Sequence, residues 1–413
     1  FYGTSSLASV TFTSGSLLQS IGNYAFQQSG LTSIAIPASV TSVGEYAFAS
    51  CASLTHVIIF CDTTATIAPD AFQSSPGLTS ITMPTTVTFM YTGTAISVTR
   101  SDSCFPTPQP TALPGGSTAP PTAVPRPTFA PGAPTALPTF VPAPTFAPGT
   151  PTAVPTVAPG MPNAPPTAHQ PGCTDVVAGD VVIPASQTSI ADGAFNGCSA
   201  LTSITFASGS LLQSIGSGAF YQSGLTSIVI PASVTSVGSG AFYGTSSLAS
   251  VTFTSGSLLE SIGSYAFQQS GLTSIAIPAS VTTIGDYAFN GASSLASVSF
   301  ASGSLLQSIG SYAFQQSGLT SIAIPASVTT IGDYAFNGAS SLASVSFASG
   351  SLLQSIGSYA FQSSGLTSIE IPASVTTIGY YSFSSASSLA NVSFASGSLL
   401  QSIGSYAFQS SGL

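Results

Sequence analysis

The five cysteines are the side chains of this sequence with the most reactive chemistry: Cys51, Cys61, Cys104, Cys173 and Cys198. They form no C-x-x-C motif, so their spacing does not favour a zinc site. Cys51 and Cys198 occupy equivalent positions of a sequence repeat, which is typical of buried core thiols. The alternative is a pair of disulfides, Cys51–Cys61 and Cys173–Cys198, which an extracellular setting permits. Cys104 is then unpaired or bonded beyond this sequence.

Other groups that could catalyse a reaction are scarce. The two histidines are His56 and His169, and only His56 falls on a predicted strand, so no Ser-His-Asp grouping can be assembled. We therefore predict a protein that is not an enzyme, with no catalytic residue, no cofactor and no bound metal.

Four acidic residues recur at one repeat position: Glu45, Asp192, Asp286 and Asp333. Where consecutive repeats both carry one, two strand spacings of about 4.8 Å separate the carboxylates. Calcium requires oxygens at about 2.3–2.6 Å, so these carboxylates are too far apart to share an ion. We expect a solvated acidic edge.

The element that must position these residues is a repeat of 47 residues. Leu225, Leu272, Leu319, Leu366 and Leu413 open successive copies, and the copies 272–318 and 319–365 differ only where Gln316 is replaced by Ser363. Such a period predicts a solenoid, in which each repeat is covered by its neighbours.

Each period contains two rungs, 272–294 and 295–318, which we call the short rung and the long rung. Apolar residues at alternate positions, such as Ile275 and Ile277, predict one strand per rung. The Ile-Gly and Ala-Phe pairs that follow leave room only for a brief helical or 3₁₀ segment. We predict a repeat solenoid of the leucine-rich type, with a parallel β-sheet on one face and short helical, 3₁₀ or irregular turns on the other.

The segment 106–171 interrupts the repeat and holds 21 of the 30 prolines. Its composition favours an extended polyproline II spacer, which would span up to about 200 Å at 3.1 Å per residue. It separates a block at 1–105, whose last rung is degenerate, from a block at 172–413. We expect two independent solenoids of about four and about ten rungs. One solenoid with a long insertion is the alternative. The sequence starts and stops within a repeat, so we expect a piece of a longer chain.

Small polar residues flank the apolar positions of each predicted strand, so they should point outward and form a ladder of hydroxyls. We take this exposed strand face as the candidate ligand-binding surface. It carries no aromatic or Arg anchor in 173–413, which weakens high-affinity protein binding there. Tyr287, Tyr312 and Tyr334 lie in the turns, where they make contacts or shield the core. The ladder residues are Ser203, Thr205, Ser227, Ser250, Thr252, Ser274, Ser297, Ser299, Ser321, Ser344, Ser346 and Ser368.

The rung resembles the leucine-rich repeats of the BspA-like (Treponema-type) family of surface proteins. The pattern I-G-x-x-A-F-x-x-C-x-x-L is matched by Val43-Gly44, Ala47-Phe48, Cys51 and Leu54, and I-x-I-P by Ile275, Ile277 and Pro278. The resemblance covers nearly all of 1–100 and 178–413. It implies a leucine-rich solenoid at a cell surface, linked with adhesion to host, matrix or cell partners. Because the functions of the family vary, the resemblance does not identify a ligand.

The charge balance limits the partners. Two basic residues and a net charge of −9 leave no surface for nucleic acid or for an anionic membrane, and no long apolar stretch crosses a membrane. We predict an extracellular or cell-surface adhesion scaffold that binds surface or matrix proteins or a polysaccharide. The alternatives are a structural, self-assembling filament or cell-wall protein, and lattice binding of ice or polysaccharide by the ladder. Asn391-Val392-Ser393 is an N-glycosylation sequon on the same face, either glycosylated or unmodified.

Overall fold

The computed structural model describes residues 1–12, 15–60, 65–84, 87–89, 97–100 and 171–413. All of them belong to one unit of contacts, which comprises 1–107 and 170–413. The proline-rich segment lies outside the described residues, and so does its predicted polyproline II conformation.

Each rung contains two strands rather than the single strand that the sequence predicted. In the short rung 272–294 the first strand is β18 (Ser274–Ile277), with exposed and buried residues in strict alternation. Pro278 follows it and has no N–H to continue the ladder. The second strand, β19 (Thr283–Ile284), buries Ile284. Each rung therefore contributes one strand to each of two sheets.

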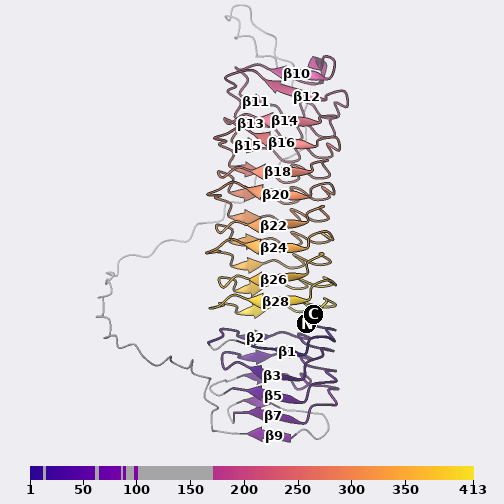
Figure 1. Ribbon diagram of the computed structural model, residues 1–413, viewed down its shortest axis with the longest axis vertical. Helices are drawn as coiled ribbons and strands as arrows, with labels where there is room; N and C mark the ends of the chain where they lie inside the picture. Colours follow the sequence, from indigo (N-terminus) through magenta and orange to yellow (C-terminus); the bar gives the residue numbers. More distant parts are fainter. Residues whose placement is uncertain (13–14, 61–64, 85–86, 90–96, 101–170) are drawn as a thin grey trace, which may run out of the picture. The chain divides into compact units, whose positions relative to one another are not determined.

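The first strands of successive rungs pair in parallel, and so do the second strands (Figure 1). In 171–413 the first strands form a ten-stranded sheet: β10 (Asp180–Ile183), β12 (Ser203–Phe206), β14 (Ser227–Ile230), β16 (Ser250–Phe253), β18, β20 (Ser297–Phe300), β22 (Ser321–Ile324), β24 (Ser344–Phe347), β26 (Ser368–Ile371) and β28 (Asn391–Phe394). The second strands form another: β11 (Ser189–Ile190), β13 (Ser214–Ile215), β15 (Ser236–Val237), β17 (Ser261–Ile262), β19, β21 (Ser308–Ile309), β23 (Thr330–Ile331), β25 (Ser355–Ile356), β27 (Thr377–Ile378) and β29 (Ser402–Ile403).

The block at 1–100 repeats this arrangement with fewer strands. Its first sheet has five strands, one more than the four rungs expected, because β9 pairs with β7. The strands are β1 (Ser9–Val10), β3 (Ser33–Ile36), β5 (His56–Ile59), β7 (Ser80–Met83) and β9 (Ser97–Arg100). The second sheet contains β2 (Ser20–Ile21), β4 (Ser42–Val43), β6 (Thr66–Ile67) and β8 (Thr88–Phe89).

The turns that join the strands are not helical. The one helical element among the described residues is the 3₁₀ helix η1 (Cys173–Asp175), next to the first rung of the second block. Elsewhere the turn amides alternate between two kinds of acceptor. Phe289 N donates to Ala313 O of the next rung at 2.7 Å, whereas Asn290 N donates to Tyr287 O within the turn at 3.1 Å. Of the predicted helical, 3₁₀ or irregular turns, the irregular form is therefore the one that these turns adopt.

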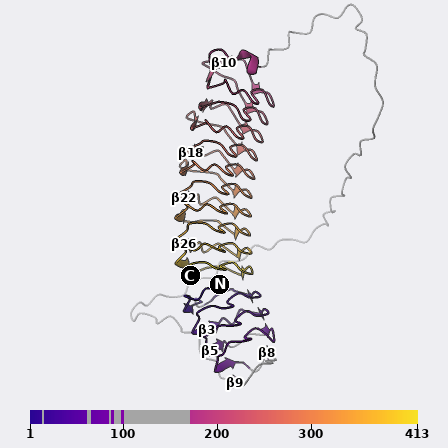
Figure 2. The same cartoon turned by 90° about the vertical axis from the view of Figure 1, so that its right-hand side faces the viewer.

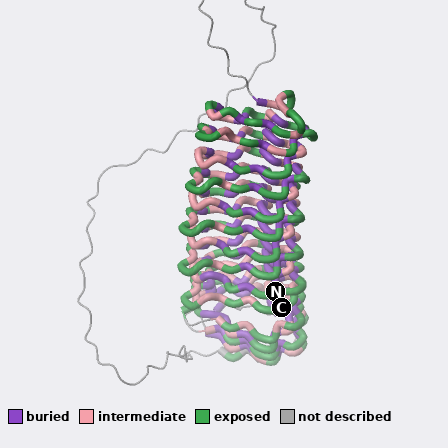
Figure 3. The backbone as a smooth tube through the Cα atoms, turned by 45° about the horizontal axis from the view of Figure 1, so that its top comes forward, coloured by how far each residue is buried: buried purple, intermediate pink, exposed green. Residues whose placement is uncertain are grey.

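The rungs stack one on another (Figure 2). The core runs along the inside of this stack, so buried and exposed segments alternate around the turns (Figure 3). Its buried apolar residues fall into two clusters, one within 181–408 and one within 18–87. The Ala-Phe phenylalanines stack in a continuous column, with Phe289 5.3 Å from Phe267 and 5.1 Å from Phe314. Aromatic pairs at this separation contribute about 0.5–1.5 kcal/mol beyond the buried area.

The Ile-Gly glycine is required by close stacking rather than by its backbone angles. A Cβ at Gly310 would lie 2.7 Å from the backbone nitrogen of Asp286 in the preceding rung. Gly285, Gly332 and Gly357 face equally short backbone contacts of 2.5–2.6 Å. The repeat therefore keeps glycine where one rung contacts the next.

Candidate functional site

The predicted hydroxyl ladder lies on the outer face of the ten-stranded sheet from β10 to β28. Eleven of its twelve residues are exposed, and Ser203 is half-buried. The strands are in register, so Ser274 is paired with Ser297 and Ser297 with Ser321. The same pairing continues from Ser321 to Ser344 and from Ser344 to Ser368. The serines thus form one column at the strand spacing.

The hydroxyls of this face fall into two sets. Threonines next to the ladder donate to the preceding rung: Thr226 Oγ1 to Thr202 O at 2.9 Å and Thr273 Oγ1 to Ala249 O at 3.3 Å. Ser203 donates to Asp180. Within the described part of the chain, the side-chain hydroxyls of the ladder serines from Ser227 to Ser368 make no hydrogen bond, so they remain available to a ligand.

Beside the ladder lies a row of shallow hollows that the sequence did not predict. Three of them, of about 580, 650 and 500 Å³, lie at equivalent repeat positions, separated by two periods and by one period of 47 residues. We define the hollows by one phenylalanine and one proline each: Phe206 with Pro231, Phe300 with Pro325, and Phe347 with Pro372.

The hollows arise from unequal loops after the strands. In the short rung, three residues separate Ile324 from the buried Val328, whereas five residues separate Phe300 from the buried Leu306 in the long rung. The longer loop turns at Gly303, whose φ is +73° and beside which a Cβ would have open space. The long-rung loops therefore flank the Pro-Ala segment of each short rung.

The phenylalanines of this row are half-buried rather than fully buried. Phe300, Phe206, Phe253 and Phe347 pack against the core from strand positions that alternate with the outward ladder residues. They are therefore partly exposed beside the ladder rather than aromatic anchors on it. A row of exposed leucines, the first of each Leu-Leu pair, follows the same period: Leu211, Leu258, Leu305, Leu352 and Leu399, between 46% and 58% exposed.

The exposed acidic row also accepts hydrogen bonds from the backbone of neighbouring rungs. Asp192, Asp286 and Asp333 each accept a hydrogen bond at 2.7 Å through Oδ1 from the backbone nitrogen of a serine in the next rung. Glu45 differs, because its own backbone nitrogen donates to Asn23 Oδ1 at 2.9 Å. The expectation of a merely solvated row was therefore incomplete.

The turn tyrosines form a stacked column on the outside of the Ala-Phe turn. Tyr287, Tyr312 and Tyr334 are half-buried, with ring centroids 4.5 and 4.6 Å apart. Burial, with the neighbouring tyrosines adding to it, raises the pKa of Tyr287 and of Tyr334. Stacked rings cover one another's faces, so this column offers ring edges and hydroxyls rather than flat surfaces.

The cysteines behave differently in the two blocks. Cys173 and Cys198 form a disulfide, the pairing that the sequence suggested, and it joins η1 to the first rung. Cys51 is a free, buried thiol 3.3 Å from Ser29 Oγ and 3.0 Å from Phe26 O, so the suggested Cys51–Cys61 bond is wrong. Burial raises the pKa of Cys51, which makes it unreactive. Cys61 and Cys104 lie outside the described residues.

The remaining candidates offer no catalytic centre within the described ranges. His56 is exposed, with Nδ1 2.8 Å from Thr55 Oγ1, and His169 lies outside those ranges. No group of three or more His, Cys, Asp or Glu side chains there could hold a metal ion. Asn391 of the sequon is exposed at the start of β28. No described helix is long and apolar enough to span a membrane.

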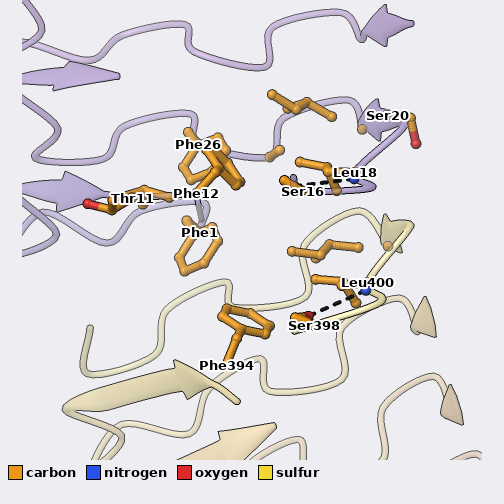
Figure 4. A pocket seen from close by; sticks show the side chains of 16 residues that line it. Phe1, Thr11, Phe12, Ser16, Leu18, Ser20, Phe26, Phe394, Ser398 and Leu400 are labelled. Carbon is orange, nitrogen blue, oxygen red and sulfur yellow. Dashed lines mark hydrogen bonds between the residues drawn. The ribbon is translucent and has the colours of Figure 1, made fainter. Parts of the chain in front are cut away.

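A separate pocket of about 100 Å³ is lined by residues of 1–26 and 394–404 (Figure 4). Ser16 and Ser398 line it, and their Oγ atoms accept from the backbone nitrogens of Leu18 and Leu400 at 3.3 and 3.4 Å. The rest of the lining is mostly apolar, with no ionisable side chain. The side chains of this pocket therefore supply no general acid or base.

Parallel strands, stacked phenylalanines and the repeated Leu-x-x-Ile-x-Ile pattern define a leucine-rich-repeat solenoid. The chain belongs to the BspA-type leucine-rich repeat family, whose repeat region matches in six copies over 1–94, 177–296, 213–330 and 307–413. The family predicted from the sequence is thus confirmed. A comparison with curated proteins found no match.

The chain is similar to several solved structures. The pneumococcal vaccine antigen PcpA is 24% identical, with 56% of this chain and 66% of that chain covered and a TM-score of 0.38. A leucine-rich repeat protein from Bacteroides ovatus is 21% identical, with 92% and 84% covered and a TM-score of 0.37. A leucine-rich cell surface protein from Faecalibacterium prausnitzii is 21% identical, with 91% and 83% covered and a TM-score of 0.32.

Proposed function

We propose that this protein is a non-enzymatic interaction scaffold that acts outside the cell or at its surface and binds proteins there through the outer face of the sheet β10–β28. The observation that carries this proposal is the repetition, along a sheet of ten strands in register, of free serine hydroxyls from β14 to β26 and of a half-buried phenylalanine on every second strand. An extended surface of this kind suits an extended or multivalent partner.

The location rests on two further features. A disulfide between Cys173 and Cys198 forms and persists in oxidising surroundings. The family is one whose members are expected at cell surfaces. Glycosylation at Asn391 would be compatible with this location and would cover the end of the face at β28.

Binding of the full chain to cells and to immobilised matrix proteins tests the proposal. We expect saturable binding that Ser299→Glu with Ser346→Glu weakens at least tenfold, because both residues are exposed on the ladder. The control is Thr283→Glu with Thr330→Glu, which places the same charges on the second sheet. Absence of saturable binding, or equal weakening by both pairs, would exclude this face as the binding surface.

The in-register hydroxyl column also favours a second candidate, binding to a regular lattice. Ladder serines recur at about the 4.8 Å strand spacing, and such a spacing can match repeating groups of ice or of a polysaccharide. Ice-crystal shaping and polysaccharide co-sedimentation by the full chain measure this directly. A protein inactive in both assays would rule lattice binding out.

A further inference from the structure

The hollows identify the class of partner more closely, and this inference rests on the proposed function. The hollows at Phe300 and Phe347 lie two rungs apart, and neighbouring strands of a sheet lie about 4.8 Å apart, so these two hollows are about 9.6 Å apart. A ligand that fills each hollow in the same way must present an equivalent group at this interval.

Among regular peptide conformations, polyproline II has a matching repeat. It advances about 3.1 Å per residue with three residues per turn, or about 9.3 Å per turn. A β-strand repeats at about 6.7 Å and an α-helix at about 5.4 Å. Every third residue of a polyproline II peptide therefore faces the same side at the interval of the hollows.

The lining suits such a peptide. Each hollow combines a half-exposed phenylalanine ring with a proline and small residues, and polyproline II peptides dock in grooves lined by aromatic side chains. The hollows at Phe206 and Phe300 contain no ionisable side chain, and the hollow at Phe347 contains only Glu370. The matching ligand is therefore uncharged.

The neighbouring hydroxyls supply the polar part of the contact. A polyproline II backbone has no internal hydrogen bonds, so its carbonyls need donors. Ser299 and Ser346 line the hollow at Phe300, and both hydroxyls are exposed without a partner in the described structure. They can donate to carbonyls that face the sheet.

We infer that the hollows are a binding site for an uncharged, proline-rich peptide in the polyproline II conformation, lying along the sheet with one proline in each hollow. The occupant that we propose is a segment of a second protein, the extended partner that the proposed function requires.

The probe is fluorescein-labelled (Pro-Thr-Ala)5, whose anisotropy is followed as protein is added. The protein is the full chain in which all 21 prolines of 106–171 are replaced by serine, so that its own proline-rich sequence cannot compete with the peptide. We expect saturable binding. Two control peptides, (Ser-Thr-Ala)5 without proline and (Pro-Thr-Ala-Ala)4 with a longer proline interval, should bind at least tenfold more weakly.

Paired variants locate the site. Ala301→Glu with Ala348→Glu fills the hollow at Phe300 from exposed loop positions, and it should weaken binding at least tenfold. Ala296→Glu with Ala343→Glu adds the same charges to exposed positions of the same two rungs outside the hollows, and it should change affinity less than twofold. Circular dichroism confirms that each variant is folded.

Failure of (Pro-Thr-Ala)5 to bind, or equal weakening by the two alanine pairs, overturns the inference. Binding to cells that persists without peptide binding would leave the proposed function standing. The unmodified chain then tests the source of the ligand. Peptide binding equal to that of the serine-substituted chain supports a second protein as the partner. Weaker binding would mean that 106–171 competes with the peptide, and it would overturn that assignment.

Discussion

The tyrosine column shows how this repeat uses a backbone conformation that ordinary residues avoid. Among the described residues, nine tyrosines have positive φ, and Tyr312 is at +59°. In the first rungs of the second block Gly193, Gly218 and Gly240 hold the same position at +58° to +65°. The left-handed conformation costs a non-glycine residue about 1–2 kcal/mol. Stacking against two neighbours, at about 0.5–1.5 kcal/mol per pair, offsets that strain.

This balance predicts the order of two variants. Tyr312→Ala loses both stacks and keeps the strain, so the free energy of unfolding should fall by about 1–3 kcal/mol. Tyr312→Gly loses the same stacks but relieves the strain, so it should be about 1 kcal/mol more stable than Tyr312→Ala. Urea unfolding of the full chain measures both. If the glycine variant is no more stable than the alanine variant, the left-handed backbone is not strained as argued.

At the level of the element, a ladder of side-chain amides ties five successive turns together. Gln268 Nε2 donates to Asn290 Oδ1, Asn290 Nδ2 to Gln315 Oε1 and Gln315 Nε2 to Asn337 Oδ1, at 2.7–3.0 Å. Asn337 Nδ2 then donates to Gln362 Oε1 at 2.8 Å. In the next rung the residue after Phe383 is Ser384, which has no side-chain amide, so the amide ladder ends there.

The middle of the ladder should matter more than its end. Gln315→Met removes two hydrogen bonds at about 0.5–1.5 kcal/mol each, so the free energy of unfolding should fall by about 1–3 kcal/mol. Gln362→Met removes one, and Asn337 Nδ2 keeps the Gln362 backbone oxygen at 3.4 Å, so the loss should be at most half as large. The two sites lie in almost identical copies of the long rung, which makes them matched controls. Equal losses on urea unfolding would contradict a ladder that couples the rungs.

These elements also show how far the sequence predicted the fold. Alternation at Ser274–Ile277 was enough for the first strand, its register and the exposed ladder, because period-2 burial is a local property. The second strand at Thr283–Ile284 was missed, because two residues show no period. The sequence also allowed helical turns. It could not exclude them, because the hydrogen bond from Phe289 to Ala313 joins different rungs and no local sequence pattern shows it.

The site was predicted in part for the same reason. The outward hydroxyls can be predicted from the alternation within a single strand. The hollows cannot, because each forms where the loop of a long rung lies beside the loop of a short rung. Phe300 looked like a core residue because its spacing from Val298 equals that of Ile277 from Ile275. Only the extra length of 301–305 leaves its ring half-exposed beside Pro325.

At the scale of the whole molecule, the stacked tyrosines predict a stability that depends on alkaline pH. Burial first, and neighbouring tyrosines second, raise the pKa values of Tyr287 and Tyr381 above the ordinary value of 10.0. Tyr334 and Tyr406 are raised by the same causes. In the unfolded chain these phenols ionise at about 10, below their folded pKa values. The folded state therefore binds more protons above pH 10, and its stability falls as pH rises through the folded pKa values.

We expect the free energy of unfolding of the full chain to be level between about pH 8 and pH 9.5 and to fall above about pH 10. Because every rung is stabilised by its neighbours, losses at several rungs of one block add along the solenoid. Urea unfolding at each pH, with tyrosinate absorbance at 295 nm, measures both effects. A variant with glycine at positions 287, 334, 381 and 406 should lose less stability over the same pH range. Ionisation of all the tyrosines at about 10 in a chain that remains folded would contradict the raised pKa values.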